Sequence, residues 1–334
     1  MDHNELANSL SMTEIVRLQD TLSRALVRRF EKKLALAFSD VCGSTAYCAR
    51  YGDEAGKKVQ QRHIDLIQRV LTSTEGRIVD TAGDGAFLCF PTLDGAAHAL
   101  IELQRQIALD NDGRPVEHRL ATRIGLHFGS ALSDGDQVSG DSVNFSARVA
   151  ASAEPSEIRL SLQAFHELSD EALRLRCRKQ KAVGLKGLSE PVELLVLDWL
   201  DPAIFPAAAR IDGGPEQKLP PRDIIRFGRL KEQDGEAAND VLLESSDPAA
   251  SNRISRWHFE LHRSSAGFLL RSVSSSPTVV DGQSLQKGQT APIRPGSVVR
   301  VGEVLTLEFL GDQRASHDAT FMPDQEPTVF NRKG

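Results

Sequence analysis

Two acidic residues stand in glycine-containing turns at the ends of apolar runs. Asp40 follows the run LALAFS, and Asp84 lies at the tip of the turn in TAGDGAF. Two carboxylates that lie side by side can hold paired divalent cations, one to lower the pKa of an attacking hydroxyl and one to neutralise a triphosphate. A single Asp in such a turn is usually only a turn residue, so this chemistry needs further support from the chain.

The elements that would position these turns alternate between strand and helix patterns over residues 34–198. The runs LALAFSD, RIVDTAGDGAFLCF and TRIGLHFGSAL predict strands, with a hairpin around the Gly-Asp-Gly turn. Helical periodicity at residues 59–71 and 93–107 separates them. The order β-α-β-β-α-β predicts an α+β ferredoxin-like palm with the hairpin at the centre of an antiparallel sheet.

Several motifs in this segment resemble the class III nucleotidyl cyclases. FSDVCGST resembles the first metal loop of that family, in which the amides of Gly43, Ser44 and Thr45 would receive phosphates. TAGD resembles its second metal motif. TRIGLHFG resembles the strand that carries a phosphate-facing arginine, here Arg123.

Two later motifs continue the resemblance. GDSVNFSAR resembles the signature helix of the family, and its Asn144 and Arg148, four residues apart, share one helical face. They match the pair that orients the ribose and stabilises charge on the phosphate, a task that suits the planar donor fork of arginine. LKGLSEPVELLVL resembles the closing strand, with Lys186 as a further phosphate contact.

The resemblance implies a lyase that forms a cyclic nucleotide from a nucleoside triphosphate, with two Mg²⁺ or Mn²⁺ ions held by Asp40 and Asp84. It also implies a head-to-tail homodimer. One subunit would give the two acidic residues, and the other would give the base-reading residues, Asn144 and Arg148. A monomer would then hold no complete site.

The base-reading positions depart from the family pattern. Adenylyl members place Lys four residues before the second metal Asp, where this chain has Asp80, and the second position falls at Gln137. Together these two side chains can satisfy guanine N1, N2 and O6, whereas only Gln137 can serve adenine N1. Residue chemistry favours GTP and the base rate among bacterial members favours ATP, so we expect ATP with GTP close behind. An Asp80 that points away from the base stays open as an alternative.

The C-terminal third of the chain lacks the alternating strand and helix patterns of residues 34–198. Residues 199–222 are rich in Pro, Ala and Gly, which predicts a linker. Residues 223–311 hold short strand-like runs separated by turn residues, which predicts a small all-β sandwich.

Three motifs in this sandwich, FGR, ND and SRWH, resemble forkhead-associated (FHA) domains, which bind phosphothreonine. The resemblance implies phosphate contacts at Arg229, Ser255 and Arg256, and a loop-bracing role for His258. The chain departs from the family where Asn-Gly is usual, because it has Ser276 and Pro277 there, and Ser276 is the candidate phosphothreonine contact at this position. The missing Asn normally grips the peptide backbone.

The two ends of the chain carry patterns of their own. Residues 1–33 contain an apolar helical stripe, which either packs on its own domain or assists a dimer.

Residues 312–334 read as a polar, flexible tail, in which DATFM and EPTVF share an acid-x-Thr-apolar pattern. Thr320 and Thr328 are therefore candidate substrates of a Ser/Thr kinase, which the FHA domain of the same chain or of a dimer partner would then capture. Alternatively, the tail only docks on its domain.

Composition narrows the classes of function. A net charge of -6 argues against a nucleic-acid partner, and no apolar run approaches the roughly 20 residues that span a membrane. The N-terminus has charges where a secretion signal needs an apolar block, so we expect a cytoplasmic protein. Four scattered cysteines form no CxxC pair and predict neither zinc nor disulfides.

Two rival functions stay open. The chain is alternatively a phosphorylation-dependent FHA adaptor whose inactive cyclase half serves as a dimer scaffold. A diguanylate cyclase would carry GG(D/E)EF in the hairpin, where this chain reads AGDGAF.

Overall fold

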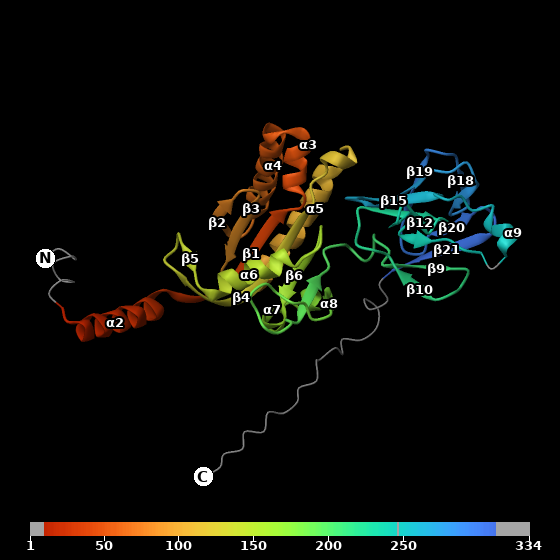
Figure 1. Ribbon diagram of the computed structural model, residues 1–334. Helices are drawn as coiled ribbons and strands as arrows, with labels where there is room; N and C mark the ends of the chain where they lie inside the picture. The colour runs from red at the N-terminus through yellow and green to blue at the C-terminus, as the bar shows by residue number, and fades with distance from the viewer. Residues whose placement is uncertain (1–9, 246, 312–334) are drawn as a thin grey trace, which may run out of the picture. The chain divides into compact units, whose positions relative to one another are not determined.

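The computed structural model describes residues 10–245 and 247–311 of the 334-residue chain. The chain divides into two compact units, the first built mainly from residues up to Leu200 and the second mainly from those that follow (Figure 1). Among the described residues, no helix combines the length and the apolar character that crossing a bilayer requires.

An eight-stranded mixed sheet forms the centre of the N-terminal unit. Its strand order is β2-β3-β1-β4-β6-β8-β7, and β5 pairs with β4 off this path. The strands are β1 (Glu31–Val41), β2 (Arg77–Ala82), β3 (Gly85–Phe90), β4 (Thr122–Ser133), β5 (Val138–Ser139), β6 (Ile158–Ser161), β7 (Cys177–Lys179) and β8 (Leu194–Leu197). The order β2-β3-β1-β4 with antiparallel pairs confirms the ferredoxin-like palm.

The expected place of the hairpin was wrong, because β2 lies at one edge of the sheet and β1 lies between β3 and β4. The burial pattern gives the physical reason. Residues 34–37 of β1 are all buried, which suits a strand that is paired on both sides and covered on both faces. The described residues of β2 are exposed or only half-buried and include two charged side chains, which suits an edge.

Helices cover both faces of this sheet. They are α3 (Ser44–Tyr51), α4 (Asp53–Leu71), α5 (Leu93–Asn111), α6 (Asp141–Ala151), α7 (Leu162–Glu167) and α8 (Glu171–Leu175), with a short 3-10 helix at Val116–His118. Alternate residues of β1 point to opposite faces. Ala35 and Ala37 pack in the core that includes α4 and α5, whereas Leu34 and Leu36 pack in the cluster that Val143 of α6 joins. Ser39 therefore shares the first face and Asp40 the second.

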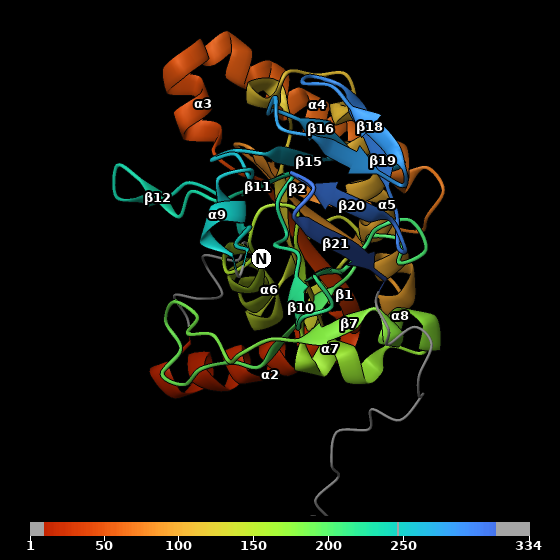
Figure 2. The ribbon, with the colours of Figure 1, turned by 90° about the vertical axis from the view of Figure 1, so that its right-hand side faces the viewer.

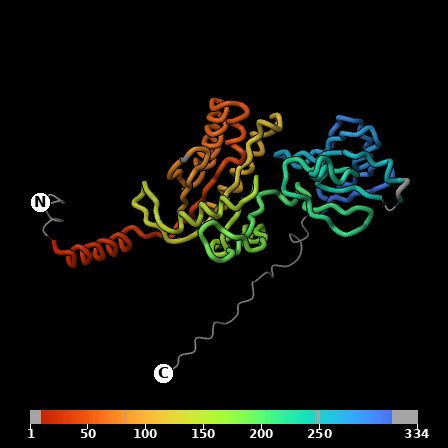
Figure 3. The backbone as a smooth tube through the Cα atoms, in the orientation of Figure 1, coloured from red at the N-terminus to blue at the C-terminus, as the bar shows by residue number. Residues whose placement is uncertain are grey.

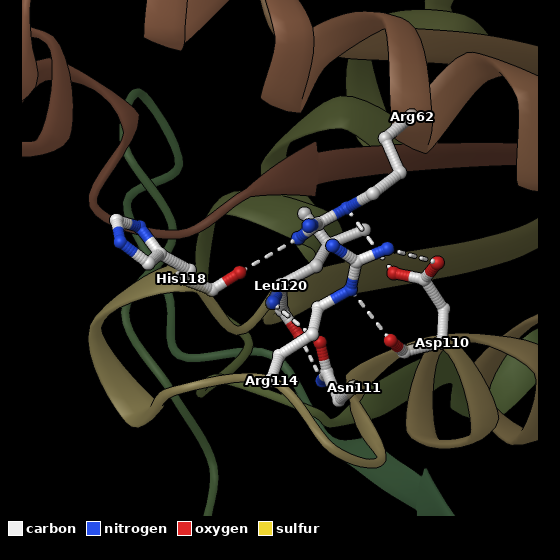
Figure 4. A network of polar contacts seen from close by, with 6 residues as sticks. All are labelled: Arg62, Asp110, Asn111, Arg114, His118 and Leu120. Atoms are coloured by element: carbon white, nitrogen blue, oxygen red, sulfur yellow. Dashed lines mark hydrogen bonds and ion pairs between the residues drawn. The ribbon is translucent and has the colours of Figure 1, made fainter.

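A polar network fixes the loop that leads into β4 (Figure 4). Arg62 of α4 donates from Nη2 to the carbonyl of His118 at 3.0 Å, and its Nε lies 3.2 Å from Oδ2 of Asp110. Asn111 exchanges two hydrogen bonds of 2.7 Å with the backbone of Leu120. These contacts hold the strand that delivers Arg123 to the site.

The N-terminal helix α2 (Met12–Phe30) follows the expected pattern of a helix, with a capping box between Ser11 and Glu14. Figure 3 follows the backbone from this helix onward. None of its residues is buried, and Ile15, Leu22 and Leu26 are 44%, 56% and 50% exposed. A helix packed along its apolar stripe on its own domain is therefore not what the described residues form.

The C-terminal unit is a β-sandwich, as expected (Figure 2). One sheet has the order β10-β9-β21-β20-β17-β18 and the other β14-β11-β15-β16-β19, and β12 and β13 form a small hairpin. The elements are β9 (Ala208–Ile211), β10 (Glu216–Lys218), β11 (Ile224–Gly228), β12 (Glu232–Gln233), β13 (Glu236–Ala237), β14 (Val241–Leu242), α9 (Pro248–Ser251), β15 (Phe259–Ser264), β16 (Gly267–Ser272), β17 (Thr278–Val280), β18 (Gln283–Leu285), β19 (Thr290–Ile293), β20 (Val298–Val301) and β21 (Leu305–Leu310).

The structure corrects the linker expected at 199–222. Ala208–Ile211 form β9, which pairs antiparallel with β21, and Glu216–Lys218 add the edge strand β10. Phe205 is buried as well, and its ring packs edge-on against Phe268 at 5.4 Å between centroids. A Pro- and Gly-rich composition masked these short runs, because their pairing partner lies almost a hundred residues further along the chain.

Candidate active site

The fold brings the two acidic turns together. Asp40, near the end of β1, pairs antiparallel with Gly85, the residue directly after Asp84. A cleft of about 240 Å³ opens on the α6 face of the sheet, and its walls include Asp40, Asp80 and Arg123. The sequence prediction that the two carboxylates lie near one another is consistent with this register.

Arg123 lies against Asp40 within the cleft. Its Nε and Nη2 donate to Oδ2 of Asp40 at 2.8 and 2.6 Å, and this hydrogen bonding raises the pKa of the arginine. The residue that was expected to face a phosphate therefore balances the charge of an acidic residue in this structure. Its place in the cleft keeps the guanidinium at the site.

His63 of α4 is a site residue that the sequence analysis missed. It is fully buried, and it bridges Oγ of Ser39 at 2.8 Å and the carbonyl oxygen of Asp84 at 3.2 Å. Burial lowers the pKa of the imidazole to about 4, so the ring is neutral near pH 7. The signal was present, because position 63 falls on the same helical face as the buried Leu66, Ile67 and Val70.

The segment after Asp40 is shaped for an anion. Gly43 adopts a left-handed conformation with φ of 72° and caps α3, which begins at Ser44. The first amides of a helix have no partner within the helix and attract negative charge, as the phosphate-loop prediction for Gly43, Ser44 and Thr45 requires. Burial raises the pKa of the neighbouring Cys42 to about 11, so its thiol stays protonated.

The candidate base reader Asp80 lines the same cleft as Asp40, whereas the resemblance implies that the base-reading residues come from the opposite subunit to the acidic pair. A β-bulge between Ile78 and Asp80 shifts the register of β2 against β3 and re-aims the side chains there. Oδ1 of Asp80 accepts the backbone N–H of Thr81 at 2.8 Å.

The second candidate base reader, Gln137, is exposed in the loop between β4 and β5. The backbone N–H groups of Gln137 and Asp136 donate to Oδ1 of Asp134 at 2.9 and 3.1 Å, which lowers the pKa of that carboxyl. Arg77 of β2 donates to the carbonyl of Asp136 at 3.0 Å, so one arginine ties this loop to the strand that carries Asp80.

The remaining predicted residues lie elsewhere on the unit. Among the described residues that line the cleft, α6 contributes Ala147, Ala150 and Ala151 but neither Asn144 nor Arg148. A Cβ atom on Gly187 would lie 3.6 Å from Nη2 of Arg148, so the arginine lies beside the turn that follows Lys186. One subunit therefore separates the acidic half of the predicted site from Asn144, Arg148 and Lys186.

The acidic half of the predicted site, Asp40 and Asp84, fits a divalent cation that is bound together with substrate phosphates. The described residues contain no group of three or more His, Cys, Asp or Glu side chains that could hold a metal. Mg²⁺ in proteins commonly takes one or two carboxylates and completes its shell with water and substrate phosphates. Two carboxylates, those of Asp40 and Asp84, would match that donor set.

The C-terminal unit gathers the residues predicted to bind phosphothreonine. The backbone N–H of Arg229 donates to the carbonyl of Ser255 at 3.1 Å, and the hydroxyls of Ser255 and Ser276 lie 2.9 Å apart. Ser274, which the sequence analysis did not single out, also bonds Ser255. Arg256 is exposed beside the ring of Trp257.

Two buried or half-buried side chains brace these loops. Nδ1 of His258 accepts the backbone N–H of Ser255 at 3.1 Å, and Nε2 faces the carbonyl of Pro277 at 3.4 Å, which confirms the predicted bracing role. Asn239, from the ND motif, donates to the carbonyls of Leu230 and Arg256 at 2.9 and 2.8 Å. The candidate phosphosites Thr320 and Thr328 lie outside the described residues.

Comparisons with known proteins also divide the chain into an N-terminal and a C-terminal unit. The family model described as adenylate and guanylate cyclase catalytic domain matches residues 27–197, and that of the FHA domain matches residues 225–302. An adenylate cyclase of Podospora anserina is 28% identical over 158 residues, which are 40% of this chain and 7% of that protein. An adenylate cyclase of Glutamicibacter nicotianae is 25% identical over 162 residues, 48% of this chain and 38% of that protein.

Among solved structures, an adenylate/guanylate cyclase/hydrolase from Silicibacter pomeroyi is 23% identical, with a TM-score of 0.45 over 50% of this chain and 96% of its own. This chain spans 7% of the Podospora anserina protein and 38% of the Glutamicibacter nicotianae protein, well under half of either. The assignment of the N-terminal unit rests on the family model, which matches just over half of the chain.

Proposed function

Because the chain belongs to the family of adenylate and guanylate cyclase catalytic domains, we propose that it is a homodimeric cyclase that converts ATP to cyclic AMP and diphosphate. GTP is a close second as substrate. The observation that carries this proposal is the register that sets Asp40 against Gly85 and so brings the two acidic turns to one end of the sheet.

Asp40 and Asp84 would hold two Mg²⁺ or Mn²⁺ ions. When bound, such ions lower the pKa of the attacking 3′-hydroxyl and neutralise charge on the triphosphate. Arg123 fixes the orientation of the Asp40 carboxylate through its two hydrogen bonds. The N-terminal amides of α3 bind phosphate oxygens, and the cleft wall of β1 and β3 positions the nucleotide.

The second half of each site would come from the partner subunit. Asn144, Arg148 and Lys186 do not line the cleft of their own subunit, which supports a site completed in trans. From the partner, Asn144 would orient the ribose and Arg148 would stabilise the charge that develops on the phosphate as the bond to diphosphate breaks. The isolated subunit would then be inactive.

The base preference is set by Asp80 and Gln137 in this proposal. The carboxylate of Asp80 accepts from guanine N1 and N2 or from the adenine amino group, and the amide of Gln137 serves guanine O6 or adenine N1. We rank ATP first and GTP close behind. Product analysis with ATP and with GTP in parallel tests both the activity and its ranking.

The FHA domain would regulate the enzyme by binding phosphothreonine. Arg229, Ser255 and Ser276 lie on loops of the sandwich that meet at Ser255, and Arg256 is exposed next to them. An arginine and a hydroxyl are the donors that a phosphate group requires. The source of the phosphothreonine would be another protein or the chain's own tail, modified by a Ser/Thr kinase.

The alternative is an adaptor with an inactive cyclase scaffold. It predicts phosphopeptide binding without any cyclic nucleotide in the product analysis. Asp40 and Arg123 share one cleft, Asp84 lies directly before Gly85 of the same cleft, and α3 begins four residues after Asp40; this arrangement favours the active enzyme. Cyclic nucleotide formation by the 334-residue chain, lost in Asp84→Ala, would decide against the adaptor.

A further inference from the structure

His63 connects the two acidic turns from the opposite face of the sheet. Its ring is fully buried, and it contacts Ser39, the residue before Asp40, through Nε2 and Asp84 itself through Nδ1. Both contacts are within hydrogen-bonding distance, at 2.8 and 3.2 Å. No other described side chain bonds to residues of both acidic turns.

The partners of His63 fix the direction of both hydrogen bonds. A backbone carbonyl only accepts, so Nδ1 must carry the proton that is donated to Asp84. In the neutral ring Nε2 then accepts, and the hydroxyl of Ser39 donates to it. One tautomer of a neutral imidazole satisfies both partners, and the ring is locked in one orientation.

The two bonds set the separation of the backbone segments that present the carboxylates. Ser39 and Asp40 are adjacent on β1, and alternation of side chains sends Ser39 to the α4 face and Asp40 to the cleft. Asp84 stands in the turn at the tip of the hairpin, whose last ladder pair toward β1 is Asp40 with Gly85. Beyond that pair and the β2–β3 ladder itself, His63 adds a hydrogen bond from α4 to the carbonyl of Asp84 in the turn.

We propose that His63 is a positioning residue that holds Asp40 and Asp84 at the spacing required for paired divalent cations. The proposal rests on the proposed function, because the cations are those of the cyclase site. It assigns a role to a helix residue that touches neither substrate nor metal. Partners that orient metal ligands in this way typically contribute 10- to 100-fold to metal affinity.

The test measures Mn²⁺ binding to the 334-residue chain by isothermal titration, with 3′-deoxy-ATP present so that no cyclisation takes place. His63→Leu should bind Mn²⁺ about 10- to 100-fold more weakly than wild type. Ser39→Ala, a milder change, should weaken binding less. His63→Asn should recover part of the affinity, because its amide nitrogen can take the place of Nδ1 toward the carbonyl of Asp84.

A second buried histidine provides the matched control. His127 of β4 is 5% exposed and pairs with Oγ of Ser161 at 2.8 Å, so His127→Leu also removes a buried His–Ser hydrogen bond. Both leucine variants should lower the thermal midpoint, but only His63→Leu should weaken Mn²⁺ binding.

The possible outcomes distinguish loss of the positioning role from loss of the metal site itself. Wild-type affinity in both His63→Leu and Ser39→Ala would overturn the positioning role while leaving the metal site intact. Equal loss of affinity in His63→Leu and His127→Leu would also overturn it, since general destabilisation would then explain the effect. A wild-type protein that binds no Mn²⁺ would overturn the proposed metal site, and the positioning role with it.

Discussion

Arg123 directs two N–H donors at a single oxygen of Asp40, with Nε 2.8 Å and Nη2 2.6 Å from Oδ2. Among the described residues no further hydrogen bond reaches this carboxylate, so its other oxygen, Oδ1, is left for a cation. The two residues lie directly opposite each other on β1 and β4. This pairing fixes the orientation of the Asp40 side chain, as the proposed cation site requires.

The first prediction concerns the acidic pair. Asp40→Asn and Asp84→Asn should each lower turnover by more than about 100-fold, since losing even an outer partner of a metal site costs 10- to 100-fold. The Asp40–Arg123 pair is 27% and 39% exposed, so Asp40→Asn should cost no more than about 1 kcal/mol of unfolding free energy. Cyclic nucleotide assays and urea unfolding measure the two effects.

Asp65→Asn is the control for this pair, because Asp65 is exposed on α4 and bonds only Gln61 among the described side chains. It should retain wild-type turnover. Turnover near the wild-type rate in either acidic variant would remove the two-metal hypothesis.

The second prediction concerns the shared site. Asp84→Ala removes the acidic half and Arg148→Ala the other half, so each variant alone should be inactive. In a random mixture, half of the dimers contain one chain of each kind, and each such dimer keeps one intact site. Activity should therefore return to about one quarter of wild type.

Mixing must be shown to exchange subunits, for example by a fluorescent label on one variant. A mixture that forms mixed dimers and stays as inactive as its components would contradict the model of a site built from two chains.

Much of the fold could be predicted from local sequence patterns. The 3.6-residue and two-residue periodicities predicted the helices and strands in the right order, and the turn sequence around Asp84 predicted the hairpin. Strand order is a different matter, because it depends on pairing between distant segments. The edge position of β2 and the pairing of β9 with β21 both follow from such long-range contacts.

The candidate site likewise has one part that local sequence predicts and one part that depends on long-range contacts. Its acidic residues stand in recognisable turns, but their surroundings depend on contacts between segments far apart in sequence. His63 reaches Ser39 across 24 positions and Asp84 across 21, and Arg123 reaches Asp40 across 83. Sequence periodicity placed His63 on a buried face without naming its partners, and it gave Arg123 no reason to bond Asp40.

The third prediction concerns the base pocket. Asp80→Lys supplies a donor for adenine N1 and removes the acceptor for guanine N1 and N2. The ratio of ATP to GTP turnover should rise roughly 5- to 150-fold, since a polar group that the bound nucleotide buries without a partner costs about 1–3 kcal/mol. Initial rates with each nucleotide at equal concentration measure the ratio.

Glu75→Lys makes the same change of charge at an exposed position five residues earlier and should leave the ratio unchanged. An unaltered ratio in Asp80→Lys would show that Asp80 does not read the base.

The last prediction joins the phosphopeptide site to the tail. Thr320 and Thr328 occur in matching acid-x-Thr-apolar contexts, and phosphorylation would add roughly -1.5 to -2 charges and three acceptor oxygens to each. A tether of about 10–20 residues beyond β21 keeps the effective concentration near millimolar, which substantially fills even a weak site. We therefore expect tail-phosphorylated protein to bind a phosphothreonine peptide more weakly than unmodified protein in isothermal titration. Arg229→Ala should bind none, whereas Arg271→Ala, which changes an exposed arginine on β16, should bind like wild type. Equal affinities of the phosphorylated and unmodified proteins would mean that the tail does not compete for this site.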